Sequence, residues 1–269
     1  MWLLTLKSIL VATDLTDSSR PALRTAASLA PLAGTSLHLL YVADDPKPDD
    51  EARLREQFRI AAPDAPEPDS VRVIVGSPAA AIVQHAVEVD ADALILGPHR
   101  RTGMPGEMGS TAANVVRNAP CPCLVAAADL RLPLERVIAP IDLSEVASGA
   151  LSVALSWASA LRPRPAKANL TALHVTTNSA SRTAEQAVRE EVEQARTRAG
   201  GAAHVDIREM IAHHSDPVEE ILRTAASESA DLLVMGTRDE VRSVSDLGSV
   251  AAAVARRTQC PLLLVPPAT

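Results

Sequence analysis

Short apolar runs alternate along the chain with longer amphipathic stretches. In the first half the apolar runs are rich in Leu, Val and Ile, and they fall at about 6–13, 36–43, 70–75, 92–97 and 122–127. Bounded runs of this composition are typical of strands that are buried on both faces of a sheet. Their alternation with helical stretches predicts an α/β fold with a parallel sheet and right-handed crossovers.

Helix starts can be recognised between the apolar runs. Thr16 or Asp17 can cap a helix that extends to about Ala33. Ser77-Pro78 opens another helix, because proline suits the first helical turn, and Gly109-Ser110 opens a third. The second half repeats these starts and adds a charged helix with a solvated face, at Ser144, Asp216-Pro217, Gly248-Ser249 and 183–199.

The chain contains an internal repeat. Asp92–Gly97 recurs as Asp231–Gly236, and other segments recur in the same order. These are Ile9–Thr16 with Val137–Ser144, Ser36–Val42 with Asn169–Val175, Gly109-Ser110 with Gly248-Ser249, and Cys121-Pro122 with Cys260-Pro261. Collinear recurrence indicates two homologous domains in tandem, which we place at 1–131 and 132–269.

Composition narrows the class of protein. The chain has 269 residues, of which 47% are hydrophobic and 22% are charged, and a net charge of −7. This acidic balance argues against a general binder of nucleic acid or of anionic membranes. We expect neither a signal peptide nor a transmembrane helix. The three cysteines cannot form a disulfide framework, so we expect a cytoplasmic protein.

Candidate binding residues gather at the predicted carboxyl ends of the strands, where open parallel sheets bind ligands. Asp14 ends the first strand, Val42 ends the second, and a loop from Gly97 to Thr111 follows the fourth. The free N–H groups near Ser110 suit an anion, and Arg100 adds positive charge. Two alternatives stay open: the loop is only a surface loop, or Asp14 merely caps the following helix.

Taken together, these motifs resemble those of universal stress proteins. The residues that carry the resemblance are Ile9–Asp14, Leu94–Gly97, Gly109-Ser110 and Ala119–Pro122, and the pattern occurs twice. The resemblance implies two tandem, doubly wound, five-stranded parallel sheets of strand order 3-2-1-4-5, similar to adenine nucleotide hydrolases. It also implies an intrachain pseudo-dimer in which the domains pair through their fifth strands.

Many members of that family bind ATP through a Gly-x2-Gly-x9-Gly-Ser/Thr loop, and both repeats depart from it. Arg100 and Asp239 stand where the second glycine belongs, and the first and last glycines are one position too close. The resemblance still implies ATP, ADP or AMP with Mg²⁺ in the first domain, the second being degenerate because its loop carries Asp239-Glu240. The implied nucleotide-binding residues are Asp14, Val42, Gly97, Arg100, Gly109, Ser110 and Thr111.

Three functions remain open on the sequence. The first is a stress-associated regulatory protein that binds a nucleotide, and the second is a nucleotide-free scaffold acting through unidentified protein partners. The third is a very slow ATPase. We identify no catalytic residues and no metal ligands, so we expect hydrolysis to be absent or very slow. We expect no nucleic-acid or membrane partner, and a homodimer stays open.

Overall fold

A computed structural model describes residues 6–31, 35–98, 110–143, 148–177, 182–200, 204–237 and 248–267. The chain divides into two compact units. The first repeat comprises Thr5–Leu130, and the second repeat contains Arg131–Thr269. Each repeat is an α/β unit and is described separately below.

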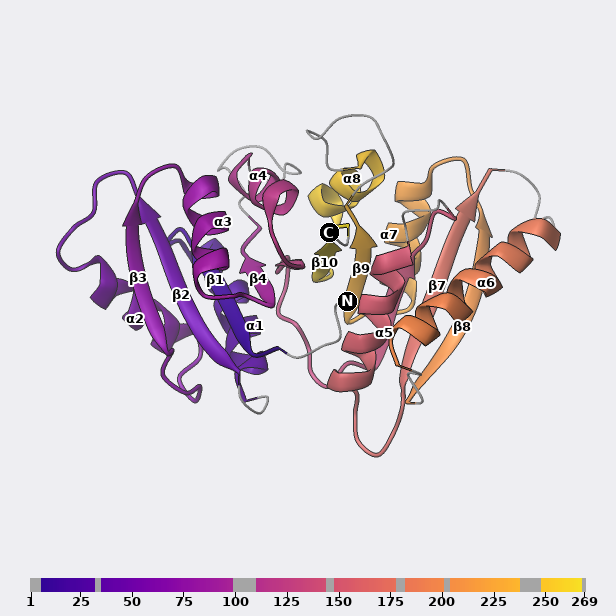
Figure 1. Ribbon diagram of the computed structural model, residues 1–269, viewed down its shortest axis with the longest axis horizontal. Helices are drawn as coiled ribbons and strands as arrows, with labels where there is room; N and C mark the ends of the chain where they lie inside the picture. The colour runs from indigo at the N-terminus through magenta and orange to yellow at the C-terminus, as the bar shows by residue number, and fades with distance from the viewer. Residues whose placement is uncertain are drawn as a thin grey trace. The chain divides into compact units, whose positions relative to one another are not determined.

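The first repeat is built on a parallel sheet of strand order β3-β2-β1-β4-β5 (Figure 1). Its strands are β1 (Ser8–Thr13), β2 (Ser36–Ala43), β3 (Ser70–Val75), β4 (Ala93–Leu96) and β5 (Cys123–Val125). Its helices are α1 (Arg20–Leu29), α2 (Asp50–Ala61), α3 (Pro78–Glu88) and α4 (Ser110–Asn118). The order reverses between β1 and β4, which makes the carboxyl ends of these strands the switch point where such sheets bind ligands.

Helices cover both faces of this sheet (Figure 1). Helices α1 and α2 pack against each other and on one face, whereas α3 packs on β2 and against α4 on the other. The central strand β1 is buried along its whole length, and the side chains of Ile9, Leu10 and Val11 are fully buried. Burial on both faces explains why β1 is a continuous apolar run.

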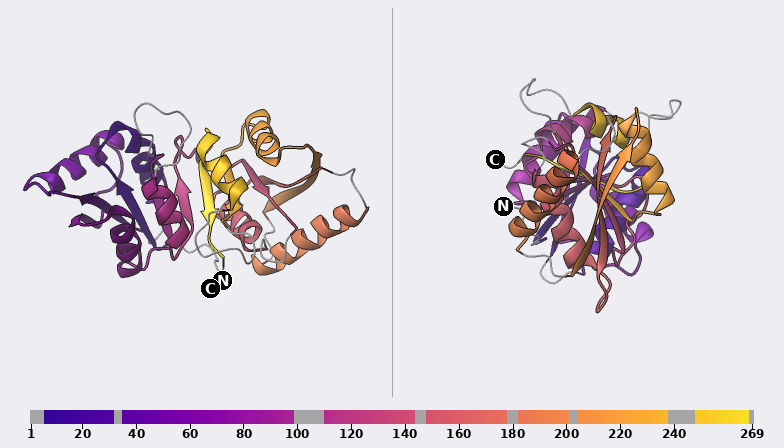
Figure 2. Two further views of the ribbon diagram at one scale, coloured as in Figure 1. Left: turned by 90° about the horizontal axis from the view of Figure 1, so that it is seen from above. Right: turned by 90° about the vertical axis from the view of Figure 1, so that its right-hand side faces the viewer.

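The second repeat has the same order, β8-β7-β6-β9-β10 when written from the corresponding edge. Its strands are β6 (Arg136–Pro140), β7 (Ala168–Thr176), β8 (Val205–His213), β9 (Leu232–Gly236) and β10 (Leu262–Val265). Its helices are α5 (Ser148–Leu161), α6 (Arg182–Arg198), α7 (Pro217–Ser227) and α8 (Ser249–Arg257). Helices α5 and α6 lie side by side on one face, and α7 and α8 pack together on the other (Figure 2).

The predicted fold class and strand order are confirmed within each repeat, and the predicted strands of the first repeat lie where expected. The predicted cap residue Thr16 precedes a short 3-10 helix (Asp17–Ser19), which runs directly into α1 at Arg20. Helix α1 ends at Leu29 instead of near Ala33, because Pro31 has no N–H to continue the helical ladder. Residue Ala33 itself lies outside the described residues. The pairing of the fifth strands stays a prediction.

Two charged helices pack on the sheets through few apolar side chains. The start of α2 was not identified from the sequence, because α2 is dominated by charged residues and only Leu54 and Phe58 supply large buried apolar side chains. The predicted charged helix of the second repeat is α6, which has a solvated face and a buried stripe of Val188, Val192 and Ala195. Both helices therefore hold the sheet through a narrow apolar stripe.

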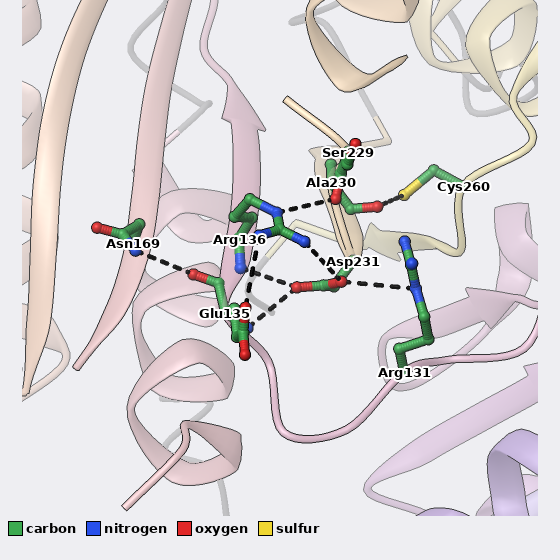
Figure 3. Close-up of polar contacts among 8 residues, drawn as sticks. All are labelled: Arg131, Glu135, Arg136, Asn169, Ser229, Ala230, Asp231 and Cys260. Atoms are coloured by element: carbon green, nitrogen blue, oxygen red, sulfur yellow. Dashed lines mark hydrogen bonds and ion pairs between the residues drawn. The ribbon is translucent and has the colours of Figure 1, made fainter. Parts of the chain in front are cut away.

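An aspartate that begins the fourth strand ties it to the first strand in both repeats. In the second repeat, Asp231 Oδ2 accepts hydrogen bonds from the backbone N–H groups of Glu135 (3.0 Å) and Arg136 (2.9 Å) (Figure 3). Asp92 does the same in the first repeat, with Lys7 N at 2.7 Å and Ser8 N at 3.0 Å. The recurring aspartate is thus structural, lying at the amino ends of the strands.

No helix within the described ranges combines the length and the apolar character that a membrane crossing requires.

Candidate functional site

The segment after β1 is organised by the Asp14 carboxylate. Asp14 Oδ1 accepts hydrogen bonds from Thr16 N (3.0 Å), from Thr16 Oγ1 (2.6 Å) and from the buried Ser19 Oγ (2.5 Å). These contacts fold the chain back on itself directly beyond the end of β1. The expectation that Asp14 caps the next helix is met in a modified form, because the carboxylate holds the turn that precedes α1.

The backbone of Leu15, next to Asp14, is held in a conformation that an L-amino-acid side chain disfavours. Leu15 has φ of 59°, in the left-handed region that costs an L-residue about 1–2 kcal/mol. Leu15 N donates to Thr13 Oγ1 (3.1 Å). From α2, Gln57 accepts a hydrogen bond from Thr13 Oγ1 (3.0 Å) and donates one to the Thr16 carbonyl (3.0 Å). Strain of this kind persists only where surrounding contacts impose it, and it concentrates at functional sites.

Gly97, directly after β4, packs against this same segment. A Cβ atom at Gly97 would lie 3.2 Å from Ser19 Cα and 3.4 Å from the Ser18 carbonyl oxygen. Contacts this short would force the backbone of one segment to move. The sequence suggested that glycine here lets the backbone approach a ligand, and the described contacts show that it also lets β4 approach the Ser18-Ser19 turn.

A cavity of about 290 Å³ opens at the carboxyl ends of β1 and β4, beneath α3 and α4. Its volume is close to the lower end of the roughly 300–1,000 Å³ range of small-molecule pockets. The lining residues come from five elements and the turn between them. They are Ala12, Thr13, Asp14, Ser18, Ser19, Val42, Pro78, Ile82, Leu96, Gly97, Thr111 and Ala112.

Four of the residues singled out from the sequence line this cavity, namely Asp14, Val42, Gly97 and Thr111. Ser110 is the first residue of α4, where it is exposed and is not among the lining residues. Arg100 and Gly109 lie outside the described residues. The structure therefore brings these four predicted residues together, although Asp14 and Thr111 are 97 positions apart along the chain.

The remaining lining residues were missed by the sequence analysis. Pro78 and Ile82 belong to a helix whose Ser-Pro start was interpreted as structural, and Ile82 is an ordinary core residue by type. Ser18 and Ser19 sit just before a helix, where serine is commonly a cap. The sequence signal that could have identified Ser18 and Ser19 is their position a few residues after Asp14, at the end of the first strand.

The described lining suits an uncharged, partly apolar group that can form hydrogen bonds. Apolar side chains such as Val42, Ile82 and Leu96 form much of the wall, and the hydroxyls of Ser18 and Thr111 add hydrogen-bonding groups. Among the described lining residues, Asp14 is the one charged side chain. A carboxylate accepts hydrogen bonds and repels anions, so a phosphate group would need other residues to hold it.

The matching position of the second repeat is described in part, because residues 144–147 lie outside the described residues. Asp142 follows β6 and is exposed, and Leu143 has φ of 26°, so the unusual backbone of Leu15 recurs in part. Among the described residues, a Cβ at Gly236 would meet Ala150 Cβ at 3.8 Å, an ordinary contact. The close approach between the fourth strand and the turn after the first strand is therefore established for the first repeat.

The cysteines behave as packed side chains. Burial raises the pKa of the Cys121 thiol to about 12, and burial raises that of Cys260 to about 12 as well. Cys260 Sγ donates to the Ala230 carbonyl (3.3 Å) beside the Asp231 cluster (Figure 3). A thiol with a raised pKa is a poor nucleophile at neutral pH, as expected of a structural cysteine.

Comparison with known proteins places both repeats in one family. The family model described as the universal stress protein family matches residues 5–127 and again 133–266. A search of curated proteins found no match.

Solved structures show the same fold across the chain. A putative universal stress protein from Pseudomonas aeruginosa UCBPP-PA14 is 19% identical, with 98% of this chain and 94% of that chain covered and a TM-score of 0.70. A universal stress protein from Archaeoglobus fulgidus DSM 4304 is also 19% identical, with 98% and 99% covered and a TM-score of 0.71. With the repeated strand order and the double match of the family model, the chain belongs to the universal stress protein family, as a tandem of two such domains.

Proposed function

We propose that the first repeat binds an adenine nucleotide and that the protein acts in stress-associated regulation. The observation that carries this proposal is the cavity at the switch point of the first sheet, lined by Asp14, Val42, Gly97 and Thr111. Four of the residues that the family resemblance implies for nucleotide binding thus face one space of suitable size.

The chemistry of the lining supports an orientation of the nucleotide in the cavity. The adenine ring lies against Val42 and the apolar wall, and the ribose hydroxyls donate to the Asp14 carboxylate. The phosphates point toward the start of α4, where N–H groups favour an anion, and Arg100 supplies positive charge from the loop that precedes it. Because the matching loop of the second repeat carries Asp239-Glu240, the second repeat binds the nucleotide more weakly.

The test is calorimetric titration of the full chain with ATP, ADP and AMP, with and without Mg²⁺. Val42→Trp fills the cavity from a half-buried strand position. Val175→Trp is the matched control, because Val175 occupies the same repeat position in β7 and is also half-buried. We expect Val42→Trp to weaken binding at least about tenfold, a loss of about 1.4 kcal/mol, and Val175→Trp to leave affinity unchanged.

Two results contradict the proposal. One is the absence of binding heat for all three nucleotides with the wild-type chain. The other is an equal loss of affinity in both tryptophan variants, when hydrogen exchange shows that each variant keeps its sheets.

A further inference from the structure

Two histidines of the first repeat share the layer between α3 and β2 with the cavity. His38 and Val42 are four residues apart on β2, so their side chains point to the same face of the sheet. His85 follows Ile82 by three residues on α3, so the two lie on one face of the helix. The cavity is thus at one end of the α3–β2 layer, and the histidines are toward the other end.

The contacts of the two rings are incomplete. His38 Nδ1 lies 2.7 Å from Ser70 Oγ, on the neighbouring edge strand β3. His85 is only 6% exposed, and its Nδ1 donates to Glu88 Oε2 (2.9 Å). His85 Nε2 is buried and has no hydrogen-bond partner among the described residues. A proton on this nitrogen would be a buried donor without an acceptor, which costs about 1–3 kcal/mol.

The surrounding charges compensate only weakly for a second positive ring. Burial lowers the pKa of His38 from its ordinary value, the Asp69 carboxylate raises it, and the charge of His85 lowers it further. Asp69 Oδ2 is already engaged by Leu37 N (2.8 Å). Glu88 is 51% exposed, so solvent screens its attraction for a charged His85. The Glu88 carboxylate is also attracted by the charge of Arg72 on β3.

The second repeat fills the same positions with groups that do not titrate near neutral pH. Thr171 stands at the repeat position of His38, and it is paired in register with Arg208 as His38 is with Ser70. Thr171 Oγ1 donates to Glu228 Oε2 (3.2 Å), and Arg208 forms an ion pair with Glu228. Thr224 takes the place of His85 in the matching eleven-residue helix and donates to Glu220 Oε1 (3.4 Å).

We propose that the His38–His85 pair makes the first repeat sensitive to protons: as the pH falls below about 6.5, the ordinary pKa of histidine, α3 loosens from β2 and the cavity loses its ligand. Loss of the ligand rests on the nucleotide-binding function proposed above, whereas loosening of α3 does not. Pro78 and Ile82 carry the change to the cavity, because they line it from the same helix face as His85.

The direction of the effect follows from the shift of His38. A histidine whose pKa is lower in the folded than in the unfolded state contributes stability above its unfolded pKa. That stability is lost as the pH falls below 6.5 toward the folded value, because the opened form binds protons more readily. Acidification therefore favours the opened form of this layer.

The experiment is hydrogen exchange of the full chain at pH 7.5 and pH 5.5 in EDTA, corrected for intrinsic exchange rates and read by mass spectrometry. We expect the protection of α3 (Pro78–Glu88) to fall by about tenfold at pH 5.5, with α7 (Pro217–Ser227) as the internal control that changes little. His38→Thr with His85→Thr transplants the residues of the second repeat and should abolish the response. His38→Gln with His85→Gln, which keeps a neutral polar side chain at both positions, gives the same test if the threonine variant does not fold.

Unchanged protection of α3 across this pH range in the wild-type chain overturns the proposal, and so does a pH response that persists in the histidine variants. A response seen only when Zn²⁺ replaces EDTA also overturns it, since the histidines would then act as metal ligands. Repeating the ATP titration at both pH values tests whether acidification also weakens nucleotide binding. If nucleotide never binds but α3 still loosens in acid, the nucleotide proposal fails and the proton-sensitive pair stands.

Discussion

Gly97 and Gly236 stand at the same place after the fourth strand of the two repeats, and the described residues surround them differently. Behind Gly97 lies the backbone of Ser18 and Ser19, close enough that a Cβ would not fit without movement. Among the described residues, which leave out 144–147, Gly236 meets Ala150 Cβ at an ordinary contact distance. The comparison teaches that the glycine of this shared motif has a packing role in the first repeat, in addition to lining the cavity.

Substitution of these two glycines by alanine is expected to have the largest effect and is the strongest test of the comparison. Gly97→Ala should destabilise the first repeat by about 2 kcal/mol, because the backbone of Ser18 and Ser19 must shift to admit the methyl group. The contact of Gly236 with Ala150, the one given by the described residues, is ordinary, so Gly236→Ala should change the second repeat by about 0.5 kcal/mol or less. Hydrogen exchange under increasing urea measures both, because peptides of β4 and β9 report the two repeats separately in one chain. Equal losses from the two substitutions would show that the two sites are packed alike.

The strand-ending aspartates offer a second, smaller contrast. Asp14→Ala removes the acceptor that holds Thr16 and Ser19, and it should destabilise the first repeat by about 1 kcal/mol and weaken nucleotide binding. Asp142 is exposed and its charge raises the pKa of Glu191, so Asp142→Ala should change the stability of the second repeat by about 0.5 kcal/mol or less. The same exchange measurement, on peptides of β1 and β6, compares the two substitutions. A larger effect at Asp142 than at Asp14 would show that the second repeat depends more on its strand-ending aspartate.

The smallest expected effect concerns the helices that face these turns. In the first repeat α2 presents Gln57, a neutral amide that bridges Thr13 and Thr16. In the second repeat α6 carries Glu191, whose pKa is raised by burial and by the charge of Asp142, with the charge of Arg198 opposing. Glu191 Oε1 is buried without a hydrogen-bond partner among the described residues.

Glu191→Gln should therefore stabilise the second repeat at pH 7 by about 0.5 kcal/mol. A carboxyl with a raised folded pKa favours folding when it is protonated, and that contribution is lost as the pH rises through the folded pKa. The gain from glutamine should thus shrink as the pH falls toward 4.5. Urea unfolding followed by the fluorescence of the buried Trp157, in a Trp2→Phe background, measures it. A stabilisation by Glu191→Gln that increases as the pH falls would contradict this prediction.

Much of the fold followed from local patterns. The apolar runs located the strands because a strand buried on both faces must be apolar throughout, and β1 is buried at every position. The hydrophobic pattern did not identify elements that pack through few apolar side chains. An example is α2, in which Leu54 and Phe58 are the large buried apolar residues among charged ones. The helix predicted from Thr16 or Asp17 begins with a 3-10 turn, because the Asp14 contacts impose it on the residues near Asp17.

The sequence by itself determined the duplication and the α/β class, since collinear motifs and hydrophobic periodicity are local properties of the chain. The strand order was implied by the resemblance to universal stress proteins. It also pointed to Asp14, Val42, Gly97 and Thr111, because the carboxyl ends of parallel strands meet at one edge of the sheet. Only the tertiary structure decided that Gly97 serves an internal contact and that His38 and His85 share a layer with the cavity. Such facts depend on which side chains meet across elements distant in sequence, and neither spacing nor composition records those meetings.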